Sequence, residues 1–239
     1  MDKDFFHFQQ FSIKNSQSAF KINTDGVLLA AWVDVSNDNS ILDIGTGTSV
    51  ISHICHQRNP DALITGIDID EASCEEAVFS VNHNKFSKHI SIVNEDIREW
   101  NSGISFDHII TNPPYFDNGT KPSNSRLTSA KHSVSLSSES LWKSIDRLSH
   151  AQSKISLILP FTDMESCIVI ACTHGFFPHR LLNIKNRSKG KYIRAAIEFS
   201  RLKSKIDSKE LIIHSDGDSY YSDAFIDLHK DLNMIFKDM

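Results

Sequence analysis

Ile41-Leu42-Asp43-Ile44-Gly45-Thr46-Gly47-Thr48-Ser49 is the stretch of this 239-residue chain that decides its fold. A short apolar run passes into a glycine-containing turn, and periodic apolar residues follow from Val50 to Cys55. This order predicts a strand, a tight turn and a helix, the first unit of a nucleotide-binding parallel sheet. Gly45 permits a sharp turn, and Gly47 permits a ligand to approach the main chain closely.

The turn departs from the dinucleotide fingerprint at its third glycine, because Ser49 stands near that place. The departure argues against a pyrophosphate cofactor more than against a smaller nucleoside. We expect Ser49 to satisfy N–H groups in the first turn of the helix.

The next two apolar runs each end at an acidic residue. Residues 62–67 lead to Asp68, 25 positions beyond Asp43, where a carboxylate is placed to accept both hydroxyls of a ribose. The alternative role, a charge at the N-terminus of the following helix, suits Asp70 better. Residues 90–94 lead to Asp96 and Ile97. The Asp96 carboxylate can accept from the amine of an adenine, and the Ile97 side chain can cover the face of its ring. An ordinary polar loop is the equally open reading there.

A fourth apolar run, 106–110, precedes Asn112-Pro113-Pro114-Tyr115. A residue before proline is pushed out of the helical region, so Asn112 and Pro113 are expected in extended conformations. The Asn112 amide oxygen and the Pro113 carbonyl can then accept the two hydrogens of an exocyclic amine, while Tyr115 stacks on its ring. The simpler reading is a Pro-Pro turn whose tyrosine covers an edge.

Strands that alternate with helices predict an α/β fold, a mostly parallel seven-stranded sheet with helices on both faces. The last two strands, close in sequence, should form an antiparallel hairpin. The expected strands are 40–44, 62–67, 90–94, 106–111, 154–159, 176–185 and 192–200. The expected helices are 25–33, 48–58, 71–84, 137–150, 163–173 and 222–237.

These features together resemble a Rossmann-type, S-adenosylmethionine-dependent methyltransferase with an N-P-P-Y motif. The segment from Lys21 to Trp32 (K-I-N-T-D-G-V-L-L-A-A-W) and the ending Tyr221–Phe225 resemble the tRNA1(Val) (adenine(37)-N6)-methyltransferase family more closely. The resemblance covers about residues 11–236. It implies a cofactor site that includes Asp43, Gly45, Gly47, Asp68, Ile69, Asp96, Ile97, Asn112 and Thr24. It implies catalytic roles for Asn112, Pro113 and Tyr115.

Composition agrees with one methyltransferase domain over residues 1–239, with 1–35 as an extension that packs on the cofactor and substrate side. The four cysteines lack C-x-x-C pairing and the twelve histidines lack ligand spacing, so we expect reduced thiols and no metal. The absence of a signal peptide or a membrane-length apolar run predicts a cytoplasmic protein. A monomer is expected.

The charge of the chain is unevenly distributed. Residues 180–209 hold ten Lys or Arg and two acids, a net +8, which leaves −13 elsewhere because the whole chain carries −5. Basic charge gathered on one hairpin predicts phosphate binding; the alternative is a solvated hairpin that balances an acidic body. The predicted RNA contacts are Arg187, Lys189, Lys191 and Arg194, with Lys131 on the loop after N-P-P-Y.

The N-terminal segment offers two further groups. Phe5, Phe6, Phe8 and Phe11 are expected to pack rather than to stack on bases. By the resemblance, Lys21, Thr24 and Asp25 lie near the methionine end of the cofactor or the target base. From the residues alone, Thr24 is an N-cap with flanking charges.

The resemblance implies N6-methylation of adenosine in tRNA, position 37 of tRNA1(Val), by direct in-line methyl transfer from S-adenosylmethionine. The N-P-P-Y motif also fits the amide of a protein glutamine, and adenine in DNA is a third substrate class. A non-enzymatic alternative is a cofactor-binding RNA chaperone, which the intact Asn112–Tyr115 stretch disfavours.

Overall fold

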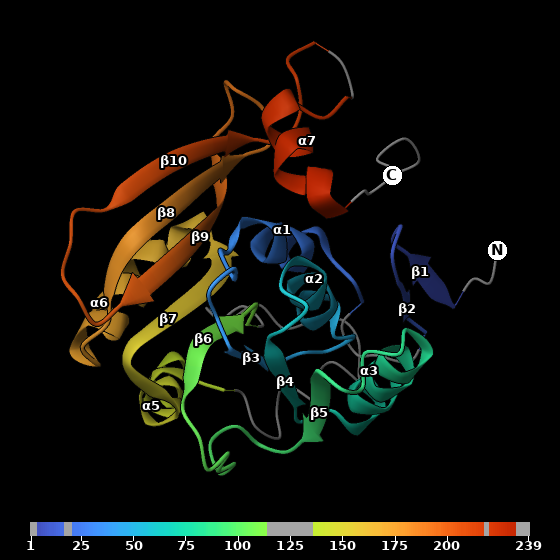
Figure 1. Ribbon diagram of the computed structural model, residues 1–239. Helices are drawn as coiled ribbons and strands as arrows, with labels where there is room; N and C mark the ends of the chain where they lie inside the picture. Colours follow the sequence, from blue (N-terminus) through green and yellow to red (C-terminus); the bar gives the residue numbers. More distant parts are fainter. Residues whose placement is uncertain (1–3, 17–20, 114–135, 218–219, 233–239) are drawn as a thin grey trace, which may run out of the picture.

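A twisted sheet with helices on both faces forms the body of the protein (Figure 1). The computed structural model describes residues 4–16, 21–113, 136–217 and 220–232. The large sheet has eight strands in the order β10-β8-β9-β7-β6-β3-β4-β5. All its neighbouring pairs are parallel except β7–β9 and β8–β9. The strands are β3 (Ser40–Ile44), β4 (Leu63–Asp68), β5 (Ile90–Asn94), β6 (Phe106–Thr111), β7 (Ser149–Pro160), β8 (Phe177–Lys185), β9 (Tyr192–Ser200) and β10 (Asp207–Ile212).

The central strands are buried on both faces because helices cover each side. Successive side chains of a strand point to opposite faces, so Ile41 enters one core cluster and Leu42 the other. One cluster joins the sheet to α1, α2, α3 and α7, and the other joins it to α5 and α6. The helices are α1 (Thr24–Trp32), α2 (Val50–Arg58), α3 (Glu71–His83), α5 (Ser138–Leu148), α6 (Met164–Thr173) and α7 (Asp223–His229), with single 3-10 turns at Phe161–Asp163 and Lys230–Leu232.

The predicted fold class is confirmed, including the antiparallel β8–β9 pair, but the strand count is wrong. β10 adds an eighth strand, parallel to β8, at the edge of the sheet. Most of its residues are exposed, so it lacks the apolar run by which the other strands are recognised. β7 is also longer than predicted, and the last predicted helix is α7 followed by a 3-10 turn up to Leu232. Residues 233–237 of that helix lie outside the described part.

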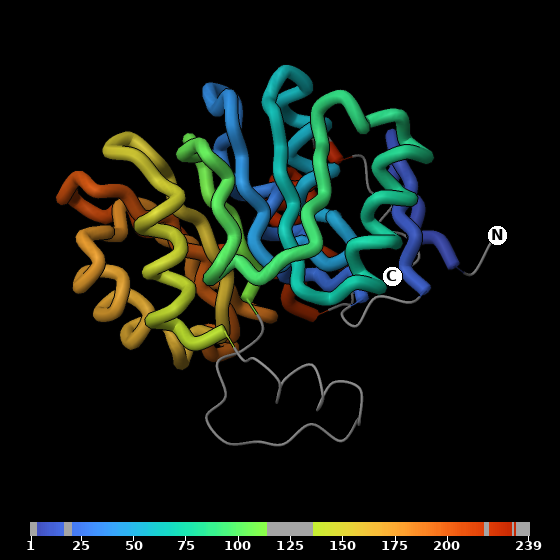
Figure 2. Tube along the Cα trace, turned by 90° about the horizontal axis from the view of Figure 1, so that it is seen from below, coloured from blue at the N-terminus to red at the C-terminus, as the bar shows by residue number. Residues whose placement is uncertain are grey.

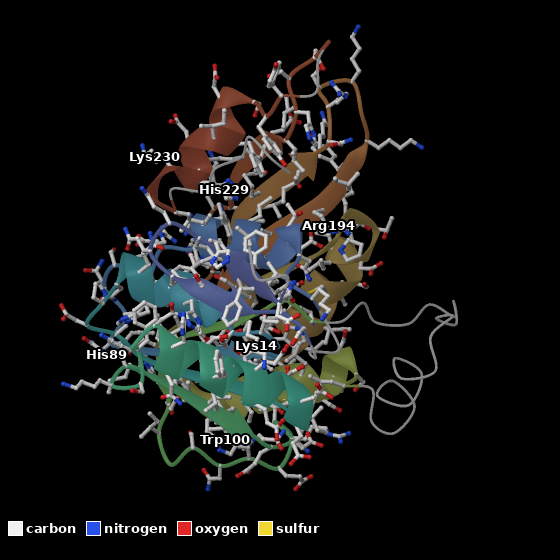
Figure 3. The ribbon with its side chains drawn as sticks, turned by 90° about the vertical axis from the view of Figure 1, so that its right-hand side faces the viewer. Lys14, His89, Trp100, Arg194, His229 and Lys230 are labelled. Carbon is white, nitrogen blue, oxygen red and sulfur yellow. The ribbon has the colours of Figure 1, made fainter. Side chains whose placement is uncertain are left out.

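A small hairpin, β1 (Phe5–His7) and β2 (Ser12–Lys14), precedes the sheet and was not predicted. Figures 1 and 2 show it beside α3, at the opposite end of the molecule from α6. Its Lys14, labelled in Figure 3, lies 5.1 Å above the Phe79 ring of α3. Phe8 and Phe11 are buried, and their ring centroids are 4.4 Å apart. Packing rather than base stacking is therefore the role of these two rings.

A chain of buried polar groups crosses the sheet. His108 Nδ1 lies 2.8 Å from Asp38 Oδ2, and His108 Nε2 lies 2.9 Å from Ser156 Oγ. Ser156 in turn donates to Glu198 Oε2 at 3.2 Å. A serine, a histidine and an aspartate are thus aligned, but all three are buried, so no substrate reaches this serine. The group satisfies its own hydrogen bonds and fixes the pairing of β6, β7 and β9.

Candidate active site

The candidate site lies at the carboxyl edge of the sheet, where the strand order reverses. From β3 the chain proceeds to β4 and β5 on one side, then to β6 and β7 on the other. In open α/β sheets, ligands bind beside such a reversal at the carboxyl ends of the strands. Ile44 of β3 is paired with Thr111 of β6, whose Oγ1 donates to the Ile44 carbonyl at 2.9 Å. Gly45 and Asn112 are therefore the next residues on two adjacent strands.

The turn after β3 is held open by left-handed backbone. Gly45, Gly47 and Ser49 have φ values of 71°, 52° and 64°. Apart from its chain neighbours, no atom of the described residues lies within 4 Å of a Cβ built on Gly45. Ser49 donates its Oγ to the Thr48 carbonyl and makes no side-chain cap bond. Our expectation that Ser49 satisfies the first N–H groups of α2 is wrong, because in the left-handed region its hydroxyl turns back on the preceding peptide.

Asp43, at the end of β3, holds this turn through hydrogen bonds to its side chain. Its Oδ2 accepts from Thr46 Oγ1 at 2.7 Å and from the backbone N–H and hydroxyl of Ser52 at 3.2 and 2.7 Å. Burial raises the pKa of Asp43 to about 6. Its Oδ1 is buried and has no hydrogen-bond partner among the described residues. With no exposed surface, Asp43 acts through the turn, and its direct contact with a cofactor stays a prediction.

Asp68 joins the end of β4 to the same turn. Its Oδ2 accepts from the backbone N–H of Gly47 at 2.8 Å, and its Oδ1 from that of Asp70 at 2.9 Å. Burial raises the pKa of Asp68 above its usual value. Asp70, expected as a charge at the N-terminus of this helix, lies there as the N-cap of α3 and accepts from the Ser73 N–H. Ile69 beside it is 56% exposed, so an apolar side chain faces outward next to the carboxylate predicted to bind ribose.

Gly66 is a residue of this site that the sequence reasoning missed. A Cβ at Gly66 would stand 2.6 Å from Thr46 Oγ1, so the turn packs on β4 only where no side chain exists. The signal was present in the sequence, because a glycine inside a strand often marks a close approach of another segment.

Asp96 follows β5 at the same edge but already has a partner. Its carboxylate forms a bidentate ion pair with Arg98, and this bond is the main cause that lowers the pKa of Asp96. An adenine amine would have to share these oxygens with the guanidinium. Ile97 is 7% exposed and packs in the core cluster beneath α5. The roles of both residues toward adenine stay predictions.

Asn112 and Pro113 lie immediately beyond β6, as the motif predicted. The Asn112 Nδ2 group donates to Asn23 Oδ1 at 3.2 Å. Asn23, not Thr24, is the N-cap of α1, because its Oδ1 also accepts from the Gly26 N–H at 2.8 Å. The prediction of Thr24 as the N-cap is therefore wrong by one residue. Thr24 is the first residue of the helix, and its side chain is exposed. Pro114, Tyr115 and Lys131 lie outside the described residues.

Several of the predicted RNA-binding residues have partners within the protein. Arg194 Nε pairs with Asp25 Oδ2 at 2.7 Å, which joins β9 to α1 (Figure 3 labels Arg194). Arg187 donates to the Ser215 carbonyl at 2.6 Å. Lys21 donates to two carbonyls of residues 15 and 16. Lys189 and Lys191 are exposed in the turn between β8 and β9.

The turn that carries Lys189 and Lys191 lies at the same edge of the sheet as Asn112. β7 is parallel to β6, and β8 is antiparallel to β9, which is antiparallel to β7. β8 therefore runs in the direction of β6, and both carboxyl ends meet at one edge. The basic residues beyond β9, such as Lys205, lie toward the opposite edge.

Comparison with known proteins agrees with this architecture. Residues 12–134 match the family model described as the methyltransferase small domain. The chain is 36% identical over 225 residues to the tRNA1(Val) (adenine(37)-N6)-methyltransferase of Pseudoalteromonas translucida, with 94% of this chain and 96% of the relative covered. The chain belongs to the tRNA1(Val) (adenine(37)-N6)-methyltransferase family. The family protein of Bacteroides fragilis is 30% identical over 234 residues, with 97% and 98% covered.

Membership in this family confirms the predicted resemblance and makes the chain a methyltransferase. Solved structures agree on the fold. A predicted O-methyltransferase from Agrobacterium tumefaciens has a TM-score of 0.70 at 21% identity, covering 87% of this chain and 97% of its own. A ribosomal protein L11 methylase from Lactobacillus delbrueckii has a TM-score of 0.54 at 13% identity, covering 74% and 77%.

The remaining features of this family member concern thiols, metals and membranes. All four cysteines are free thiols on helices, and only Cys172 is exposed. Among the described residues, no group of three or more His, Cys, Asp or Glu side chains is arranged to hold a metal ion. None of the helices in the described part combines the length and apolar character needed to cross a membrane.

Proposed function

We propose that this protein transfers the methyl group of S-adenosylmethionine to N6 of an adenosine in tRNA, position 37 of tRNA1(Val). The observation that carries the proposal is the pairing of Ile44 with Thr111. Because adjacent strands lie about 4.8 Å apart, this register sets the amine acceptors of Asn112 and Pro113 beside the glycine turn that would hold the cofactor. The names and the identity of the relatives support the substrate.

The residues at the turn fit a nucleoside with a small charged tail. We assign the main-chain contact to Gly45 and Gly47 and the ribose hydroxyls to Asp68. The space around a Cβ on Gly45, clear of other described residues, and the carboxylate at the end of β4 support this assignment. The proposed cofactor site is completed by Asp43, Ile69, Asp96, Ile97, Asn112 and Thr24. The bound cofactor supplies an electrophilic methyl carbon on a sulfonium, so neither a metal nor a covalent enzyme intermediate is required.

The protein contributes position and electrostatics to the amine. An adenine N6 lone pair is delocalised into the ring and is therefore a weak nucleophile. Acceptance of both amine hydrogens by Asn112 Oδ1 and the Pro113 carbonyl favours a lone pair directed out of the ring plane. The same two oxygens stabilise the positive charge that develops on nitrogen. Tyr115 is proposed to stack on the base. As the bond from N6 to the methyl carbon forms, the carbon–sulfur bond would break to leave S-adenosylhomocysteine, and the amine proton would pass to solvent water.

The proposed RNA path follows the carboxyl edge of the sheet. The exposed Lys189 and Lys191 lie at that edge, where phosphate contacts would guide the anticodon arm toward Asn112. An adenosine in an anticodon loop leaves its stack at lower cost than one in a duplex, which favours an RNA loop as substrate. Residues 1–35 are proposed to pack on the cofactor and substrate side, and the contact between Asn23 and Asn112 supports this for α1.

A methyl-transfer assay with product identification tests the proposal. The protein is incubated with methyl-labelled S-adenosylmethionine and, in parallel, with unmodified tRNA, single-stranded DNA, duplex DNA or a peptide-chain release factor. Digestion and mass spectrometry of the tRNA product should give N6-methyladenosine at a single loop position. Label in the release factor would instead support a glutamine side chain as substrate, and label in DNA would support adenine in DNA. Cofactor binding without methyl transfer to any of these substrates would support the RNA chaperone.

A further inference from the structure

The first turn of α1 lies against the end of β6, and one atom joins the two. Asn23 Oδ1 accepts from the Gly26 N–H at 2.8 Å and from Asn112 Nδ2 at 3.2 Å, across 89 residues of sequence. Asn23 has extended backbone angles, φ −128° and ψ 160°, as an N-cap residue requires.

The identity of the two facing amide atoms follows from hydrogen-bond chemistry. A backbone N–H only donates, so the Asn23 atom that caps Gly26 must be the oxygen. An amide oxygen only accepts, so the Asn112 atom that faces it must be the nitrogen. Rotation of the Asn112 amide by half a turn would place two oxygens against each other and lose the bond. The cap of α1 therefore determines the orientation of an amide that lies just beyond the end of β6.

We infer that Asn23 is a positioning residue, which holds the Asn112 amide with its nitrogen toward α1 and its oxygen toward the substrate amine. This inference rests on the proposed function, because the direction of the oxygen matters only if it accepts a hydrogen from the amine. With the amide reversed, an NH2 group would face the amine, and two donors would meet.

The rest of α1 gives Asn23 a fixed support. Asp25 in the first turn is paired with Arg194 of β9 at 2.7 Å. At the other end of the helix, Arg58 donates to the Ala30 and Val33 carbonyls at 2.7 and 2.5 Å. The helix is thus tied to the sheet and to α2. In this account Arg194 and Asp25 hold the helix in place.

Three substitutions separate positioning from capping. Asn23→Asp keeps an oxygen acceptor for both donors. Asn23→Ser keeps a cap for Gly26, but its side chain is too short to reach Asn112. Ser222→Ala removes an equivalent cap, in which the Phe225 N–H of α7 donates to Ser222 Oγ, and serves as the matched control.

The kinetic test is a single-turnover methyl transfer with saturating cofactor and tRNA. We expect Asn23→Ser to lower the rate constant about tenfold, the usual effect of one lost hydrogen bond, with KM for tRNA and the melting temperature near wild type. Asn23→Asp should restore most of the rate, and Ser222→Ala should leave it unchanged. An Asn23→Ser variant that is as fast as wild type, or an Asn23→Asp variant that is equally slow, would overturn the inference.

A second measurement does not depend on catalysis. In protein labelled with ¹⁵N-asparagine, the Asn112 side-chain NH2 signals are assigned by their loss in Asn112→Asp. Asn23→Ser should shift this pair and speed its hydrogen exchange, whereas Asn23→Asp should preserve slow exchange. An NH2 pair that does not respond to Asn23→Ser contradicts the inference. If wild-type protein methylates no RNA yet the pair responds, the proposed function fails while the orientation stands.

Discussion

The backbone N–H of Gly47 donates to the Asp68 carboxylate at 2.8 Å, which ties the glycine turn after β3 to the end of β4. The same carboxylate accepts from the Asp70 N–H and so fixes the shape of the turn, and we propose that its remaining lone pairs accept the hydroxyls of a ribose.

Replacement of Asp68 by Ala should weaken cofactor binding before it affects the rate at saturation. The variant loses charge-assisted hydrogen bonds, so Kd for S-adenosylmethionine should rise roughly ten- to 100-fold in calorimetric titration. Asp68→Asn keeps one acceptor oxygen for the Gly47 N–H, so its Kd for S-adenosylmethionine should lie between that of wild type and that of Asp68→Ala. An unchanged Kd in Asp68→Ala would remove this residue from the cofactor site.

Charge reversal at Lys189 and Lys191 should raise KM for tRNA and flatten its dependence on salt. Each lost phosphate contact should lower the slope of log K against log salt by about one. Lys205→Glu is the control, because Lys205 is also exposed but lies toward the opposite edge of the sheet. If Lys205→Glu changes KM and the salt slope as much as reversal at Lys189 and Lys191, the RNA responds to the overall charge of the protein and not to this turn. If neither change has an effect, the turn is not part of the RNA path.

His53 should make the fold sensitive to acid. Burial lowers the pKa of this α2 side chain to about 4, and it packs between the Phe11 and Phe86 rings. A histidine with a depressed folded pKa contributes its full stability above the unfolded pKa near 6.5 and loses it as pH falls toward 4. The loss should reach about 3 kcal/mol in the free energy of unfolding.

Urea unfolding at several pH values between 4 and 7 measures this contribution. His53→Phe retains the ring contacts and should weaken the dependence on pH, even if its stability at pH 7 is lower. Exposed His7→Gln should retain the wild-type slope. Burial also lowers the pKa of His56 and His229, so part of the acid sensitivity should persist in His53→Phe. An unchanged slope in that variant would refute the role of His53.

The parallel core of the fold was predictable because its signals are local. The apolar runs of β3 to β6 and the left-handed glycines between β3 and α2 can be read within a few residues. β10 was missed because an edge strand buries few side chains. The place of Asp70 before α3 predicted a charge at the N-terminus of that helix, whereas its capping bond and the bidentate bond between Asp96 and Arg98, two residues apart, were not predicted.

The contacts between distant elements could not be predicted from the sequence. The hydrogen bond between Asn23 and Asn112 depends on how α1 packs against the end of β6. The ion pair between Asp25 and Arg194 joins residues 169 positions apart in the sequence. Two residues expected to bind RNA or cofactor therefore neutralise each other. Clustered charge in a sequence does not distinguish a surface open to phosphate from one already paired.

The central claim is that the Asn112 side chain accepts a hydrogen of the amine and so activates it for methyl transfer. Its most direct test is Asn112→Ala, measured by single-turnover methyl transfer to unmodified tRNA and by the Kd for S-adenosylmethionine. We expect the transfer rate to fall at least about 1,000-fold, the scale seen when a preorganised electrostatic contact is removed, while the cofactor still binds. Methyl transfer at the wild-type rate in this variant would contradict the account.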